Sequence, residues 1–147
     1  VYYRFTKDER SNSASTPCGK FILAETASSL AADAEWQFLA DCIGSGAIGA
    51  GEGPLAFKSN TEDKWYLFID QPNYHAGPNY YIPFATNDIA NGNAWEPVGA
   101  TLRENLPQNA DGGKPRHGTV IPVSRAEYEA VLAAFAPDIA VAAADPI

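Results

Sequence analysis

The sequence predicts an all-β fold with one short helix near its C-terminus. Aromatic and β-branched residues gather in short runs, and clusters of Gly, Pro, Asn and Asp separate these runs at intervals of roughly eight to fifteen residues. Hydrophobic residues make up 46% of the 147 residues and charged residues 19%, which indicates one folded domain with its own core. Periodicity alone does not decide between a β-sandwich and the blades of a β-propeller.

Three strands are expected in the first part of the chain. Residues 1–6 alternate aromatic and polar side chains and lead into a turn-rich loop, and residues 21–25 form the second strand. A helical turn or wide loop at residues 28–34 precedes the third strand, which is expected around residues 35–38. Five glycines between residues 43 and 53 then let the backbone adopt positive φ and pass close to another group.

An aromatic hairpin is expected in the middle of the chain. Residues 64–70 are apolar on both faces, as in a strand buried between layers, and the turn cluster at residues 71–79 leads into a partner strand at residues 80–86. Residues 87–97 form a second loop that contains a short edge strand at residues 94–96.

The last part of the chain is expected to contain a surface loop, a strand and a helix. Residues 102–115 are polar and glycine-rich, and residues 117–123 form a β-branched strand. Ser124 and Glu127 have the spacing of a capping box, and Pro137 ends the helix that this box opens. The apolar side of the helix consists of Tyr128, Val131, Leu132 and Phe135.

The charge balance excludes some classes of partner. Ten basic and eighteen acidic residues give a net charge of -8, which opposes binding to nucleic acid or to anionic lipid. The longest apolar stretches, such as the one after Val131, are broken by Pro137, so no segment is expected to cross a bilayer. The chain begins at Val1 without a signal-peptide pattern, so a signal peptide either has been removed or was never part of it.

The two cysteines, Cys18 and Cys42, favour a disulfide. Neither belongs to a CxxC motif or to a Cys/His cluster with metal-ligand spacing. A disulfide between them would stabilise the fold by roughly 3 kcal/mol in an oxidising compartment, which favours secretion. The alternative is two buried free thiols in a cytosolic protein.

Glu52 is the strongest candidate for a catalytic residue. It lies in the sequence Gly-Ala-Gly-Glu-Gly-Pro, so its carboxyl group is expected on a rigid turn directly before a strand that begins at Leu55. A carboxyl group held among aromatic rings and backbone stays protonated more readily and acts as a general acid. The alternative is a solvated glutamate in a flexible glycine loop.

Several further residues have more than one interpretation. Arg116 suits a carboxylate or vicinal hydroxyl groups, or is an exposed charge, and His117 could orient a carboxylate, bind a metal or its water, or satisfy a backbone carbonyl. His75, on the hairpin tip, could reach a ligand or point into water. The aromatic residues could stack on a sugar ring or form the core. They are Trp65, Tyr66, Phe68, Tyr80 and Tyr81.

A series of motifs in a fixed order resembles glycoside hydrolase family 43. The series is YYRFTKDE at residues 2–9, EGP at 52–54 with FK at 57–58, KWYL at 64–67 and RHGTVIPV at 116–123. The likeness extends from about residue 2 to residue 132, and several motifs in the right order are far more specific than one alone.

The resemblance implies a five-bladed β-propeller, of which residues 1–136 would form the C-terminal blades and residues 137–147 a tail. Enzymes of that family remove or cut arabinose- and xylose-containing polysaccharides with inversion, using an Asp base, a second Asp that tunes the acid, and a Glu acid. Glu52 matches the acid. His117 matches a histidine near the propeller axis that in many members contacts a calcium ion or its waters, and Arg116 is then placed near the substrate pocket.

No segment of this chain matches the base or the acid-tuning Asp of the family. An inverting hydrolase needs two carboxyl groups roughly 6.5–9.5 Å apart, so the isolated chain is not expected to turn over substrate. Unpaired blade edges invite aggregation, and a second polypeptide from the same precursor is therefore expected to supply the other blades.

The expected function is that of a secreted, inverting glycosidase of the α-L-arabinofuranosidase or β-xylosidase type, with Glu52 protonating the leaving oxygen of arabinan, arabinoxylan or xylan. Two other functions stay open. One is a carbohydrate-binding protein that kept the pocket and lost the base, and the other is a structural β domain without a sugar site.

Overall fold

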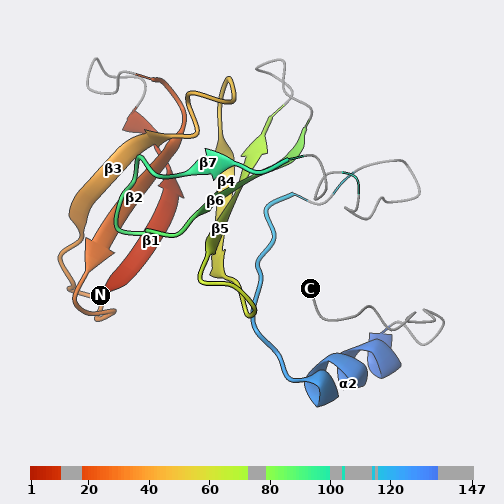
Figure 1. Cartoon of the computed structure of the whole chain (residues 1–147). Coiled ribbons are helices and arrows are strands. Elements are labelled where there is room, and N and C mark those ends of the chain that lie inside the picture. Colours follow the sequence, from red (N-terminus) through yellow and green to blue (C-terminus); the bar gives the residue numbers. More distant parts are fainter. Residues whose placement is uncertain (11–17, 73–78, 100–103, 105–113, 115, 136–147) are drawn as a thin grey trace.

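The computed structural model describes residues 1–10, 18–72, 79–99, 104, 114 and 116–135. Within these residues the chain forms two antiparallel sheets and one short helix (Figure 1). This arrangement confirms the all-β prediction with a single C-terminal helix, whereas the assignment of the sheets to propeller blades stays a prediction. Residues 137–147, expected as a tail, lie outside the described residues, and so does His75.

The first sheet has the strand order β1-β2-β3. Its strands are β1 (Tyr2–Lys7), β2 (Ile22–Ala27) and β3 (Gln37–Ile43). β3 overlaps the strand predicted around residues 35–38 but continues to Ile43, the first residue of the segment expected to form the glycine-rich loop. Alternating burial along β1 agrees with the predicted alternation of aromatic and polar side chains.

The second sheet has the order β4-β5-β6-β7. Its strands are β4 (Glu52–Lys58), β5 (Trp65–Gln71), β6 (Tyr80–Thr86) and β7 (Glu96–Pro97). β5 and β6 form the predicted aromatic hairpin, with Trp65 opposite Thr86 and Gln71 opposite Tyr80. The short edge strand is present as β7, two residues later than expected.

The core lies between the two sheets. Side chains from β2 and β3 pack against side chains from β5, β6 and the loop before β7. The buried members are Ile22, Ala24, Ala40, Ile43, Leu67, Ile69, Phe84 and Trp95. Each large aliphatic or aromatic side chain that is fully removed from water here contributes about 1.5–3 kcal/mol, so this layer holds the two sheets together.

The aromatic residues of the hairpin lie on both faces of the second sheet. Trp65 packs against the core, on the same side of β5 as the buried Leu67. On the opposite face, the ring of Phe68 contacts those of Phe57 and Tyr81, with centroids 5.1 and 5.9 Å away. Trp65 and the buried Tyr81 are therefore packing residues, in agreement with the core interpretation.

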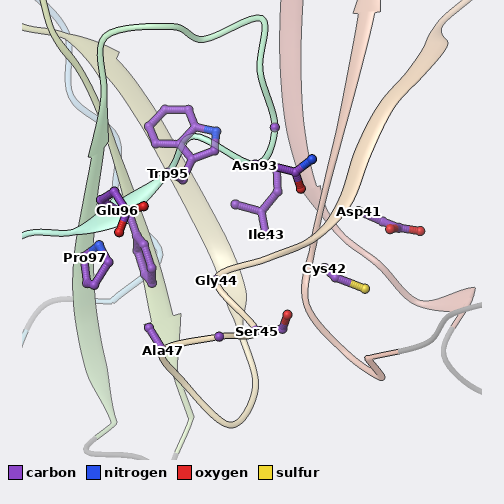
Figure 2. A pocket seen from close by; sticks show the side chains of 13 residues that line it. Asp41, Cys42, Ile43, Gly44, Ser45, Ala47, Asn93, Trp95, Glu96 and Pro97 are labelled. Atoms are coloured by element: carbon purple, nitrogen blue, oxygen red, sulfur yellow. The ribbon is translucent and has the colours of Figure 1, made fainter.

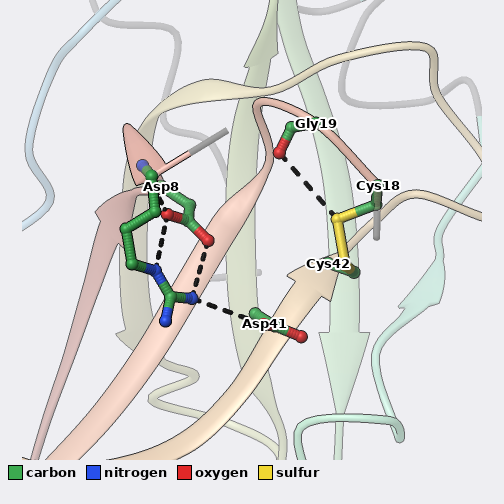
Figure 3. Close-up of a disulfide and its surroundings, with 6 residues drawn as sticks. Asp8, Cys18, Gly19, Asp41 and Cys42 are labelled. Carbon is green, nitrogen blue, oxygen red and sulfur yellow. Dashed lines mark hydrogen bonds and ion pairs between the residues drawn. A yellow bond between two sulfur atoms is a disulfide. The ribbon is translucent and has the colours of Figure 1, made fainter. Parts of the chain in front are cut away.

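The disulfide is present between Cys18 and Cys42, 24 positions apart (Figure 3). Beside it, the guanidinium of Arg10 donates two hydrogen bonds to the carboxylate of Asp8, at 2.9 and 2.8 Å, and lies 3.3 Å from Asp41. These contacts join the end of β1, the segment before β2 and the end of β3. The hydrogen bonds from Arg10 lower the pKa of the Asp8 carboxyl group.

The strand predicted at residues 117–123 is not formed. This segment has no strand pairing, and Val120, Ile121 and Val123 are exposed. In Figure 1 it is the blue stretch that leaves the second sheet and runs toward the helix. Its β-branched sequence favours an extended backbone, but a strand also needs a partner for its N–H and C=O groups, and the described residues supply none here.

The helix α2 (Arg125–Phe135) starts directly after Ser124, the first residue of the predicted capping box. The Ser124 hydroxyl donates to a Glu127 carboxylate oxygen at 2.7 Å, and the Glu127 backbone N–H donates back to that hydroxyl at 3.3 Å. None of the helical residues is buried: on the predicted apolar side Tyr128, Val131 and Phe135 are exposed and Leu132 is half-buried. Among the described residues, no helix is long and apolar enough to cross a membrane.

Candidate active site

Glu52 is the first residue of β4 and pairs directly with Asp70 on β5. The sequence placed Glu52 on a turn before a strand beginning at Leu55, but the strand already starts at Glu52. A register shift separates Glu52 from Leu55, and Gly53 adopts a positive φ of 51° within it. The irregularity turns the strand locally, as a β-bulge does, and presents the carboxyl group at the sheet end.

Two cations from the described part of the chain contact the carboxylate of Glu52. Lys7, the last residue of β1, places its Nζ 2.9 Å from Oε2, and Arg116 places an Nη2 donor 2.9 Å from Oε1. The Glu52 side chain is only 14% exposed. The two contacts come from the other sheet and from the segment after the second sheet, so three parts of the chain far apart in sequence meet here.

Asp70 is the most deeply buried member of the cluster, with a side chain that is 0% exposed. Its Oδ2 accepts a hydrogen bond from Arg116 Nε at 2.6 Å. Its Oδ1 is buried and has no hydrogen-bond partner within the described part of the chain. Arg116 therefore uses two nitrogens of its planar fork to join Glu52 and Asp70.

His117 lies over the bulge of β4 and faces both carboxylates. Its Nε2 is 3.2 Å from Asp70 Oδ2 and 3.6 Å from Glu52 Oε1. A Cβ on Gly53 would lie 2.6 Å from His117 Nδ1, so position 53 must be glycine for the ring to lie there. The backbone of His117 has a φ of +53°, which a non-glycine residue rarely adopts, and the side chain is half exposed.

Tyr81 fixes the segment that carries Arg116 and His117. Its hydroxyl oxygen accepts a hydrogen bond from the backbone N–H of Gly118. Burial raises the pKa of Tyr81, and the charge of Asp70 adds to this effect, so the phenol stays neutral at physiological pH. A neutral, buried phenol is a stable anchor for the backbone beside the carboxylates.

The electrostatic surroundings of Glu52 differ from those that the sequence suggested. The carboxyl group was expected among aromatic rings, where burial favours the protonated form. Instead it contacts Lys7 and Arg116, and neighbouring cations stabilise the ionised form.

The structure brings together all three site residues that the sequence singled out. Glu52, Arg116 and His117 form one cluster, and Arg116 contacts a carboxylate rather than only water. Sequence reasoning missed Lys7 and Asp70. Asp70 could have been found, because it ends a predicted apolar strand and has no counter-charge next to it in sequence. Burying such an acid is costly unless a distant residue pairs with it.

The short distance between Glu52 and Asp70 limits the catalytic roles that this pair of acids can share. Ligand atoms of Glu52, Asp70 and His117 all lie within 4.8 Å of one another. The two carboxyl groups of an inverting glycosidase are about 6.5–9.5 Å apart, which leaves room for the attacking water. Asp70 is too close to Glu52 and too deeply buried to be the base of such a pair. Its contacts instead suit a residue that positions Arg116 and His117.

Comparison with known proteins identifies a family for most of the chain. The model of a family described as a probable glycosyl hydrolase domain, related to glycoside hydrolase family 43, matches residues 1–129. No curated protein and no solved structure matches the chain. The match covers both sheets, the cluster around Glu52 and the start of α2. The chain belongs to this family of probable glycosyl hydrolase domains related to family 43.

Proposed function

We propose that the chain is the part of an inverting glycoside hydrolase that supplies its general acid, Glu52, for substrates containing arabinose or xylose. The observation that carries this proposal is a largely buried glutamate at the start of a strand, contacted by Arg116 and His117, in a chain of this family. Protonation of the departing glycosidic oxygen by Glu52 is the step that this chain contributes.

Arg116 and His117 are the proposed substrate-binding residues. Both are partly exposed, at 31% and 52% of their side chains, whereas Glu52 and Asp70 beneath them are shielded. A guanidinium with donors left over and an imidazole suit the hydroxyl groups of a sugar. Asp70 would hold both side chains in place from below.

The charge of the cluster explains why a further carboxylate is part of the proposal. Lys7 and Arg116 favour the ionised form of Glu52, whereas a general acid must carry a proton before the reaction. A second carboxylate approaching Glu52 would offset the cations and favour the protonated form. The base and the acid-tuning Asp would come from preceding blades, on a second chain of the same precursor.

The disulfide supports a secreted enzyme, because such bonds persist in oxidising compartments. Calcium is proposed only in water-mediated contact with His117. Direct coordination does not fit, because Lys7 and Arg116 already contact oxygens of Glu52 and Asp70, and Ca²⁺ requires six to eight oxygen ligands. Retention of calcium after dialysis against a chelator, compared between the wild type and His117→Ala, tests this part.

Substitution of Glu52 tests the proposed function in the complete enzyme. Glu52→Gln should lower kcat on arabinoxylan at least about 10²-fold, since general acid help is of this size. The loss should be smaller on aryl arabinosides or xylosides whose leaving group needs no proton. Glu25→Gln is the matched control, because Glu25 is 17% exposed and pairs with Arg4 at 2.7 Å on the first sheet.

The outcome separates the proposed function from its alternatives. If Glu52→Gln hydrolyses arabinoxylan as fast as Glu25→Gln, Glu52 is not the acid. Binding of xylan or arabinan fragments without hydrolysis by the complete wild-type assembly would favour a carbohydrate-binding protein. Absence of both binding and hydrolysis would favour a structural β domain.

A further inference from the structure

A pocket separate from the Glu52 cluster lies where the end of β3 meets the loop before β7 (Figure 2). Its volume of about 410 Å³ is within the range of about 300–1,000 Å³ that is usual for small-molecule sites. It shares no lining residue with the cluster of Glu52, Asp70 and His117. Any ligand bound here would therefore leave the candidate active site free.

The floor of the pocket is apolar except for one nitrogen. Ile43, Phe84 and Trp95 line it and are all buried. Trp95 is 7% exposed, and its Nε1 is buried with no hydrogen-bond partner in the described chain. In Figure 2 the nitrogen is on the side of the indole toward Asn93. A buried donor without an acceptor costs about 1–3 kcal/mol, so an acceptor that reaches this N–H when the indole shifts toward the pocket would recover this loss.

The rim of the pocket carries polar side chains that belong to different segments. Ser45 follows β3, Asn93 precedes Trp95, and Glu96 begins β7, and all three are exposed. The lining includes the acids Asp41 and Glu96 but no Lys, Arg or His. Arg10 pairs with Asp41 at 3.3 Å, so Glu96 is the lining charge that disfavours an anion here. A metal or ammonium cation has no lone pair with which to accept from the indole N–H.

We propose that this pocket binds a neutral polyhydroxylated molecule of about monosaccharide size. A hydroxyl group both accepts and donates, so one hydroxyl takes the N–H of Trp95 while others donate to Glu96 and to the amide oxygen of Asn93. Water fills the same role less completely, because it cannot also cover the apolar floor of Ile43 and Phe84. The pocket is thus a second sugar-binding site of the domain.

Nuclear magnetic resonance of the three indole N–H groups tests the proposal on the full ¹⁵N-labelled chain. Arabinose, xylose and xylobiose are titrated, and Trp95→Phe assigns the signal of Trp95. The Trp95 signal should move in a saturable way, whereas the signals of Trp36 and Trp65 serve as internal controls. Trp95→Phe and Asn93→Ala should each weaken binding about fivefold to tenfold, as expected for one lost hydrogen bond.

Three results would overturn the proposal. The first is a Trp95 signal that stays unchanged up to roughly 50 mM sugar. The indole N–H of Trp95 would then interact with water or with the ring of Phe5 instead of a sugar. The second is an equal shift with glycerol, which would indicate non-specific solvation by any polyol. The third is unchanged affinity in Asn93→Ala, a test that remains available if Trp95→Phe fails to fold.

Discussion

The ion pair of Arg116 and Asp70 should be a major stabilising contact of the site. Removing the charge of one partner in a buried pair costs about 3–5 kcal/mol, because the other charge stays buried and uncompensated. Asp70 is fully buried but Arg116 is 31% exposed, so Arg116→Met should cost about 3 kcal/mol and Asp70→Asn about 2 kcal/mol. The loss of unfolding free energy in the double variant Arg116→Met/Asp70→Asn should be about 1.5–3 kcal/mol smaller than the sum of the losses in the two single variants.

Urea denaturation at 25 °C, followed by tryptophan fluorescence, measures all four proteins of this cycle. The pair Arg125–Glu129 on α2 is a matched control, because its Nε–Oε1 distance is also 2.6 Å while its side chains are 68% and 59% exposed. Its coupling should be indistinguishable from zero. A coupling between Arg116 and Asp70 below about 0.5 kcal/mol would refute the view that burial gives this pair its strength.

Three more predictions concern the stability of the fold. Gly53→Ala should destabilise the fold by about 1–3 kcal/mol and displace the ring of His117, as an NMR or crystal structure would show, because the new Cβ would lie 2.6 Å from Nδ1 at a positive φ. Replacing Cys18 and Cys42 together by serine should lower the free energy of unfolding by roughly 3 kcal/mol in the urea assay. The lowered pKa of Asp8 adds stability that is present above its unfolded value near 3.8 and is lost as pH falls through the folded value, so Asp8→Asn should flatten the acid side of the stability curve.

The controls for these predictions come from the same chain. Gly19→Ala meets a φ of +78° but open space, so it should cost about 1 kcal/mol and leave His117 in place. A reductant should destabilise the wild type and leave the double serine variant unchanged. Asp33→Asn, at an exposed position, should not alter the acid side of the curve, and an effect equal to that of Asp8→Asn would contradict the assignment.

The sequence predicted the strands well because they bury one face or both. Aromatic and aliphatic runs such as β5 follow from the local pattern, and turn residues set their limits. The prediction of a strand at residues 117–123 was wrong. The β-branched residues favour an extended backbone, and this preference was taken to mean that the segment pairs with another strand. Pairing depends on a neighbour, and no local pattern in the segment reports whether one is present.

The site was only partly predictable for a similar reason. Glu52 stood out because glycines and a proline surround it, and the motif at residues 116–123 drew attention to Arg116 and His117. In the sequence, the residues next to Lys7 and Asp70 give no comparable sign that these two side chains belong to the site. Their importance comes from contacts over 45 and 46 positions, from Lys7 to Glu52 and from Arg116 to Asp70, which the packing of the sheets determines.

The charges around Glu52 connect this packing with the proposed chemistry. Lys7 comes from one sheet and Arg116 from the segment after the other, so the positive charge next to the carboxylate depends on how these two parts of the chain pack. Asp70 already takes the Arg116 Nε, and a sugar that draws the remaining donors of Arg116 away would leave Lys7 as the main counter-charge. Under the proposed function, substrate binding and protonation of Glu52 would be coupled through the guanidinium of Arg116, and Arg116 would decide whether the cluster works as an acid or only as an ion pair.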